Sequence, residues 1–172
     1  MSRAFVRELD DQPELPVRRQ ASALPPGSKN YITAGGAYRL REELRQLVEV
    51  ARPPLAGAPE DPDAKRKLLA LDQRMQQLEE SLQSAEIVPP PGGGSADVVR
   101  FGATVTVRRP NGEEDFYRIV GIDEMDLDRS WVSWASPIAK ALLNASVGQR
   151  VPFKFPSGAE ELEVLTVVYE DL

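Results

Sequence analysis

The chain has 172 residues, enough for one ordinary domain or two small ones, and its formal net charge of −6 argues against a large phosphate-binding surface. It contains no Cys and no His, which excludes a disulfide framework, thiolate chemistry, and most hydrolase triads and zinc sites. No stretch approaches the ~20 apolar residues of a membrane span and the N-terminal residues lack an apolar run, so we expect a cytoplasmic protein with no membrane partner.

Residues 1–29 combine many charges with four prolines and few large apolar side chains, a composition typical of a flexible arm. Within this arm, Ala4-Phe5-Val6 is an apolar stretch that could dock elsewhere on the protein, and the sequence does not say where.

Two stripes of apolar residues predict a pair of helices between residues 30 and 88. The first helix should begin at Thr33, whose hydroxyl can cap the free amides of the first turn, although Gly35 and Gly36 in that turn are poor helix formers. It should end by Arg52, because Pro53 disfavours helical geometry in the residue before it and cannot donate a hydrogen bond. Its apolar stripe comprises Ala37, Leu40, Leu44, Leu47 and Ala51.

The second helix should be capped by Asp61 or Asp63, with Pro62 at its first position, and should end near Ala85 or Ile87. Apolar residues recur along it at alternating spacings of three and four, as in a coiled-coil seam: Leu68, Leu71, Met75, Leu78, Leu82 and Ala85. Because only a short connection separates the two stripes, the helices should fold back on each other as an antiparallel coiled-coil hairpin. A dimeric coiled coil is the alternative.

Three carboxylates, Glu60, Asp61 and Asp63, lie at the predicted hairpin tip. As helix caps they would favour the helix dipole, and the cations at 65–67 would weaken the negative field that a metal site needs. The competing interpretation is that the tip presents these carboxylates to a metal ion.

Residues 89–95, PPPGGGS, read as a linker that precedes a separate domain at 96–172. Beyond the linker the apolar period becomes two-fold, with an Asn-Gly turn at 111–112 and a short helix opening at Ser136-Pro137. These signals predict an α+β fold with a twisted antiparallel sheet following the hairpin. The expected strands are Val98–Arg108, Phe116–Ile122, Trp131–Ala135, Val151–Phe155 and Leu162–Tyr169.

Two further groups in this domain could carry function. Trp131 and Trp134 are three residues apart in a predicted strand, so they should point to opposite faces, one into the core and one outward as a candidate contact anchor. Four acidic residues are interpreted as a solvated turn, because the Gly and the terminal Glu of a calcium loop are missing: Asp123, Glu124, Asp126 and Asp128.

Several short motifs occur in order along the chain: Tyr31-Ile32-Thr33 with Leu40-Arg41-Glu42-Glu43-Leu44, Phe101-Gly102-Ala103-Thr104-Val105, Tyr117-Arg118-Ile119-Val120-Gly121, Ser136 to Leu143, and Val147-Gly148. In these motifs residues 31–170 resemble the bacterial Gre transcript-cleavage and elongation factors, and the last segments resemble the GreB branch most.

The resemblance implies an FKBP-like domain that docks on RNA polymerase at the rim of the secondary channel, while the hairpin enters the channel. It implies that the tip acids help to hold the second catalytic magnesium of the polymerase. The chain would then have no stable metal or cofactor of its own and would not itself be an enzyme. Its contact with the nascent RNA would be indirect. It also implies polymerase binding at Ser136, Pro137, Ile138 and Ala139. The structural interpretation of that segment is a capped helix covering one sheet face, with Leu142 in the core.

The sequence departs from the family at the tip, where the Gly-Asp…Glu-Asn-Ala context is missing and the hairpin is shortened around residues 53–60. A short hairpin that occupies the channel without stimulating cleavage is therefore an alternative. Two further alternatives are peptidyl-prolyl isomerisation, suggested by the fold alone, and a generic interaction protein whose hairpin pairs with another helix.

Overall fold

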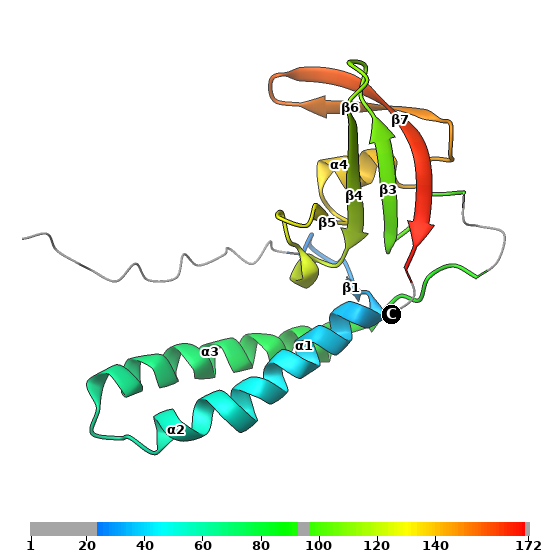
Figure 1. Ribbon diagram of the computed structural model, residues 1–172. Helices are drawn as coiled ribbons and strands as arrows, with labels where there is room; N and C mark the ends of the chain where they lie inside the picture. Colours follow the sequence, from blue (N-terminus) through cyan, green and yellow to red (C-terminus); the bar gives the residue numbers. More distant parts are fainter. Residues whose placement is uncertain (1–23, 93–96, 171–172) are drawn as a thin grey trace, which may run out of the picture.

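The computed structural model describes residues 24–92 and 97–170, so residues 1–23 of the predicted arm and 93–95 of the predicted linker lie outside it. A helical hairpin projects from a curled five-stranded sheet that carries one short helix (Figure 1). The class is therefore mixed α and β, as the sequence predicts. No helix within the described residues combines the length and the apolar character of a transmembrane span.

The first arm of the hairpin is one continuous rod made of three pieces: α1 (Ala34–Gln46), the π-helical segment η1 (Leu47–Ala51) and α2 (Arg52–Ala56). Thr33 caps its start as predicted, since its hydroxyl accepts a hydrogen bond from the Gly36 N–H at 2.9 Å.

The predicted end of this arm at Arg52 is wrong, because the helix continues through Pro53 and Pro54 to Ala56. The wider π turn of η1 interrupts the regular i→i−4 ladder immediately before the prolines. The prolines then stand in the first turn of α2, where a backbone N–H has no helical partner and its loss costs little.

The second arm is α3 (Pro62–Ser84), capped by Asp61, whose carboxylate accepts a hydrogen bond from the Asp63 N–H at 2.9 Å. Asp61 rather than Asp63 is therefore the cap. The helix stops before the predicted Ala85 or Ile87, because Ala85–Ile87 form a strand, β2, that pairs in parallel with β1 (Asn30–Ile32). The two ends of the hairpin are thus tied together at its base.

The two arms pack most tightly near this base. Ile32, Ala37, Leu40 and Leu78 are buried, with Leu44, Leu47, Leu82 and Ala85 partly buried around them. Nearer the tip, Leu68, Leu71 and Met75 of the predicted seam are only partly buried. Ion pairs between the arms contribute to the packing there. Arg74 donates two hydrogen bonds to the Glu43 carboxylate, at 2.7 and 2.9 Å, and Arg52 pairs with Asp72 at 2.9 Å.

Leu78→Ala should lower the free energy of unfolding of the hairpin by about 2–5 kcal/mol, because a side chain that is 1% exposed leaves a cavity between the arms. Leu69→Ala is the matched control on the same helix: Leu69 is 62% exposed, so its change should stay within about 0.5 kcal/mol. Urea unfolding followed by circular dichroism measures both, and equal effects would contradict the packing described here.

The domain is built on five strands in the order β5-β4-β3-β7-β6. They are β3 (Ala103–Arg108), β4 (Glu114–Val120), β5 (Trp131–Ser133), β6 (Arg150–Phe155) and β7 (Gly158–Tyr169), with helix α4 (Pro137–Leu142) between β5 and β6. The predicted turn at Asn111-Gly112 is present, with Gly112 at a φ of 86°.

The prediction of a wholly antiparallel sheet is wrong at one edge, where β5 runs parallel to β4. The intervening chain reverses twice, first through the 3₁₀ turn η2 (Ile122–Glu124) and then through the tight turn from Asp126 to Trp131, so β5 returns in the direction of β4. The first predicted strand also begins later, at Ala103, and Val98 makes only an isolated bridge to Ser146.

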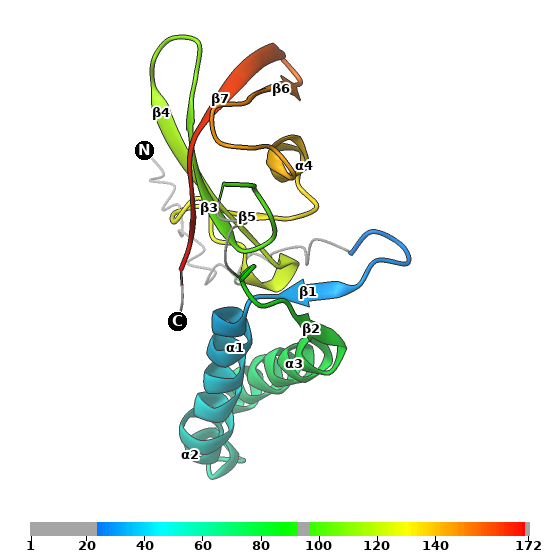
Figure 2. The same cartoon turned by 90° about the vertical axis from the view of Figure 1, so that its right-hand side faces the viewer.

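One face of the sheet holds the core, and α4 lies over that face (Figure 2). Ala139 and Leu142 of α4 are fully buried against it, as predicted for Leu142. The strand residues of this core include Ala103, Val105, Val107, Ile119, Val132, Val151, Leu162 and Val164. The other face of the sheet carries no helix within the described residues.

Candidate functional site

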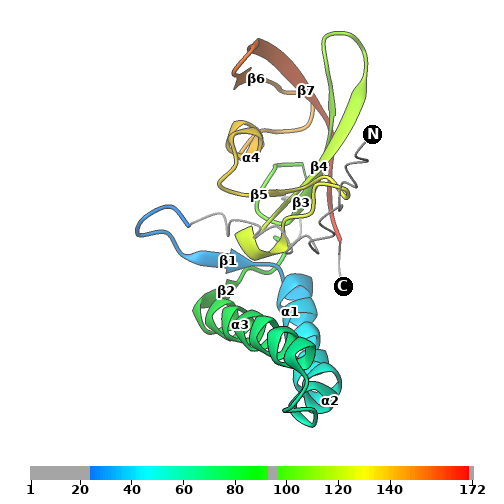
Figure 3. The same ribbon diagram turned by 90° about the vertical axis from the view of Figure 1, so that its left-hand side faces the viewer.

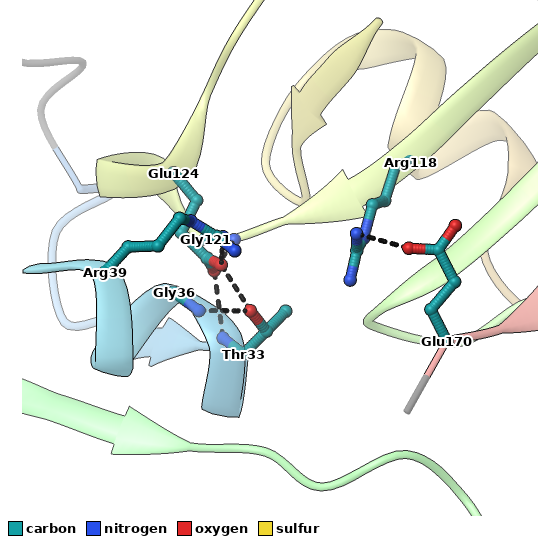
Figure 4. A network of polar contacts seen from close by, with 7 residues as sticks. All are labelled: Thr33, Gly36, Arg39, Arg118, Gly121, Glu124 and Glu170. Carbon is teal, nitrogen blue, oxygen red and sulfur yellow. Dashed lines mark hydrogen bonds and ion pairs between the residues drawn. The ribbon is translucent and has the colours of Figure 1, made fainter. Parts of the chain in front are cut away.

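A single buried carboxylate, that of Glu124, joins the hairpin to the domain (Figure 4). Its Oε2 accepts hydrogen bonds from the Thr33 N–H at 2.9 Å and the Gly121 N–H at 2.8 Å. Its Oε1 accepts from the Thr33 hydroxyl and pairs with Arg39 at 3.2 Å. The side chain of Glu124 is 1% exposed, so the start of α1 is held against η2 by a nearly dry, fully bonded group.

Gly36 makes room for this carboxylate. A Cβ built on Gly36 would lie 2.0 Å from the Glu124 Oε1, and one built on Gly121 would lie 2.2 Å from the Tyr31 carbonyl oxygen. Both glycines are therefore required by close approach.

A second polar contact lies beside the first. The Asn30 side-chain amide donates to the Asp123 carboxylate at 3.2 Å, to the Ser84 hydroxyl at 3.1 Å and to the Ser81 carbonyl at 3.3 Å. The amide thus ties η2 to the end of α3. The prediction of a solvated acidic turn is wrong for Glu124, since that residue is buried and Asp123 beside it bonds the hairpin.

The two tryptophans have different surroundings. Trp131 is half-buried between three guanidinium groups, with the Cζ atoms of Arg39, Arg118 and Arg129 at 4.7, 4.8 and 5.3 Å from its ring centroid. Burial lowers the pKa of Arg39, and the neighbouring arginines lower it further, against the effect of Glu124. Trp134 packs on the core and lies edge-on to Tyr31 at 5.6 Å.

The tip of the hairpin lies at the end remote from the sheet (Figures 1 and 3). Glu60, Asp61 and Asp63 are all exposed there. Asp61 is occupied as the helix cap, and Asp63 forms an ion pair with Arg66. Within residues 24–92 and 97–170, no three acidic side chains are grouped so that they could hold a metal ion by themselves.

The start of α4 presents part of the segment that the sequence singled out. Ser136 caps the helix by accepting from the Ala139 N–H at 3.3 Å, and Pro137 beside it is exposed. Ile138 is partly buried against the core and the Ala139 side chain is fully buried. Ser136 and Pro137 are therefore the accessible members of this set, and Ala139 is not available to a partner.

Glu42, on the outer side of α1, has a pKa lowered from 4.5 to about 2 by hydrogen bonds from Arg45 at 2.6 and 3.0 Å and from Gln46 at 3.0 Å. Since the folded pKa is the lower one, this contribution to stability is present above pH 4.5 and is lost as the pH falls from 4.5 towards 2. An NMR titration of the Glu42 carboxyl should give a midpoint near 2, moved upward by Arg45→Gln. Arg41→Gln should move it much less, and equal shifts would contradict this assignment.

Sequence reasoning missed the Glu124 contact. The available signal was the pair of glycines in the first turn of α1. Glycine destabilises a helix, so two glycines at a helix start indicate that another group approaches this turn closely.

The chain is similar to transcription elongation factors. The family described as "Transcription elongation factor, GreA/GreB, C-term" matches residues 94–169. GreB from Neisseria meningitidis serogroup B is 39% identical over 155 residues, which cover 83% of this chain and 95% of that protein. GreA from Alkalilimnicola ehrlichii is 37% identical over 156 residues, covering 83% and 99%. Gfh1 of Thermus thermophilus, a solved structure, aligns with a TM-score of 0.39 and 26% identity over 82% of this chain and 99% of that one.

Proposed function

The chain belongs to the GreA/GreB family of transcription elongation factors, and we propose that it binds RNA polymerase at the secondary channel and there modulates backtracking and transcript cleavage. The observation that supports this most directly is the helical hairpin held rigidly to its domain by Glu124, with carboxylates at the far end. A rigid projection suits entry into a narrow channel, because little conformational entropy remains to be lost on binding.

In this proposal the hairpin is a coiled coil and the domain is FKBP-like and serves as the docking body. Ser136 and Pro137 lie on its accessible surface at the start of α4 and are the proposed contacts with the polymerase. The chain does not catalyse cleavage. It would act on the RNA-cleaving activity of the polymerase, and its contact with the nascent RNA would be indirect.

Two modes of action at the tip are distinguishable. In the first, tip carboxylates complete the ligand set of a polymerase-bound magnesium, which favours oxygen ligands. In the second, the short hairpin occupies the channel without stimulating cleavage. The second mode is supported by the contacts of Asp61 and Asp63: Asp61 caps α3, and Asp63 forms an ion pair within the first turn of that helix. Of the three tip acids, Glu60 alone has no hydrogen bond or ion pair among the described residues.

RNA cleavage in a backtracked polymerase complex tests the proposal. A Glu60→Ala/Asp63→Ala variant removes two tip charges and keeps the Asp61 cap, and Glu79→Ala/Glu80→Ala is the matched control on α3 away from the tip. If the tip delivers a metal ligand, the first variant should reduce the cleavage rate to that without factor, and the control should not.

Equal cleavage rates in the wild-type chain and the tip variant would exclude metal delivery. Slower cleavage or slower nucleotide addition at saturating factor would then identify a channel competitor. Failure of the full chain to bind the polymerase at all would contradict the proposed function.

A further inference from the structure

The side chain of Arg39 links the body of the hairpin to the sheet. Among the hydrogen bonds, ion pairs and ring contacts of the described residues, the hairpin reaches the domain through Asn30, Tyr31, Thr33 and Arg39. The first three residues lie close together at the base, whereas Arg39 lies on α1 beyond its first turn. Contacts confined to residues 30–33 would leave the hairpin free to turn about its base, and a further contact along the helix fixes its direction.

Arg39 meets the ring of Trp131 on the edge strand β5. Its Cζ lies 4.7 Å from the ring centroid, and its Nη2 pairs with the Glu124 Oε1 at 3.2 Å, as the reach of this side chain from α1 in Figure 4 illustrates. The guanidinium is therefore held between a carboxylate on η2 and an aromatic ring on the sheet. A planar, delocalised cation suits both partners at once, because its edge donates hydrogen bonds while its face stacks.

The Trp131 ring is itself fixed from two other sides. Arg118 on β4 and Arg129 in the preceding turn lie against the same ring, at 4.8 and 5.3 Å from its centroid. Each of these arginines has its own acid, since Arg118 pairs with Glu170 at 2.7 Å and Arg129 pairs with Asp126 at 3.5 Å. Neighbouring positive charges can therefore share one ring, and the ring serves Arg39 as a fixed support on the sheet.

The length of the hairpin makes its direction important. The three pieces of its first arm, of 13, 5 and 5 residues, together extend about 35 Å. A rotation of about 10° at the base would therefore move the tip by about 6 Å. A functional group must be held within about 0.5 Å of its productive position, so a tilt of this size would misplace the tip carboxylates.

We propose that Trp131, by stacking on Arg39, is a positioning residue that fixes the direction in which the hairpin points from the domain. This role is separate from that of Glu124, which attaches the start of α1 to η2. The direction of the hairpin is a property of the chain by itself, and its consequence for transcription rests on the proposed function.

Distances between two spin labels test the direction of the hairpin in the full chain. The sequence has no Cys, so Lys67→Cys near the tip and Lys140→Cys on α4 create two attachment points, both at exposed residues. Pulsed electron paramagnetic resonance should give one narrow distance distribution when Trp131 is present. Trp131→Leu should broaden this distribution or shift it by several ångström, because Arg39 loses its support while the hydrogen bonds of Glu124 remain.

Phe153→Leu is the matched control, because Phe153 is a partly buried aromatic residue on β6, at the opposite edge of the sheet. It should leave the distance distribution unchanged, and Trp131→Phe, which keeps an aromatic face, should restore the narrow one. An unchanged distribution in Trp131→Leu, or an equal change in Phe153→Leu, would overturn the proposal.

Arg39→Lys is a second variant that leaves every residue of the sheet in place, and it carries the test if Trp131→Leu does not fold. The ammonium group keeps a positive charge beside Glu124 and has no planar face to stack on Trp131. The distance distribution should again broaden, and a distribution as narrow as that of the unsubstituted chain would overturn the proposal.

Transcription measurements with the unlabelled chain separate direction from binding. Trp131→Leu should lower the maximal effect of saturating factor on RNA cleavage or nucleotide addition several-fold, while the half-saturating concentration stays unchanged because the domain still docks. A higher half-saturating concentration with an unchanged maximal effect would overturn the positioning role. If the unsubstituted chain does not bind the polymerase, the proposed function alone fails, and the spin-label distances still decide whether Trp131 fixes the hairpin.

Discussion

Glu124→Ala, at the junction of hairpin and domain, is expected to lower the free energy of unfolding by about 2–4 kcal/mol. The substitution leaves the buried N–H groups of Thr33 and Gly121 without an acceptor and leaves Arg39 without its partner. Because Arg39 is 41% exposed at its side chain, water compensates part of its loss, which keeps the estimate below that of a wholly buried ion pair.

Urea unfolding of wild type, Glu124→Ala and Glu79→Ala gives the comparison, since Glu79 is an exposed residue on α3 that bonds to none of the described side chains. Glu79→Ala should change stability by less than about 0.5 kcal/mol. The proposed function adds an expected result: Glu124→Ala should weaken every effect of the hairpin on transcription while binding through the domain persists. A stability loss as small as that of Glu79→Ala would show that Glu124 does not hold the junction.

Gly36→Ala is the second substitution with a large expected effect. In an ordinary helix the change would stabilise by up to about 1 kcal/mol, because Ala is the better helix former. Here the added Cβ would lie 2.0 Å from the Glu124 Oε1, so the buried carboxylate must move and lose hydrogen bonds. We expect a net loss of about 2–4 kcal/mol, opposite in sign to the helix propensity.

Gly57→Ala is the matched control, because Gly57 has a φ of −77° and its nearest neighbour to an added Cβ is the Pro53 carbonyl oxygen at 3.4 Å. Its change should stay within about 0.5 kcal/mol. In the double variant Gly36→Ala/Glu124→Ala the overlap is gone, so the two losses should fall short of additivity by more than about 1 kcal/mol. Strict additivity would contradict the contact between these residues.

Local signals predicted the helix ends well. Asp61-Pro62 and Ser136-Pro137 each place an oxygen acceptor before a residue whose missing N–H needs no partner, and both open a helix as expected. The proline rule failed at Pro53 because it assumes an unbroken α-helical ladder, which η1 interrupts. The direction of β5 was not predictable either. The alternation of apolar and polar residues predicts which side chains of a strand face the core, and it does not predict whether the strand runs parallel or antiparallel to its neighbour.

The candidate site was predicted only in part. The tip acids and the α4 start lie on the surface as local patterns indicated, except for Ala139, whose burial follows from its position on the inner side of a one-and-a-half-turn helix. Glu124 was beyond local reasoning. Its partners Thr33 and Arg39 are 91 and 85 residues away in sequence, and nothing near Glu124 distinguishes a buried acceptor from a solvated turn.

The parallel pairing of β1 with β2 has a consequence for how such a chain can vary. Because Asn30 faces Ala85 and Ile32 faces Ile87, the entry and exit of the hairpin are held at a fixed separation whatever lies between them. Whole turns can then be removed from or added to both arms together, each changing the reach by about 5.4 Å, without altering the base. The length of the hairpin can therefore differ between relatives while the paired strands β1 and β2 at its base stay the same.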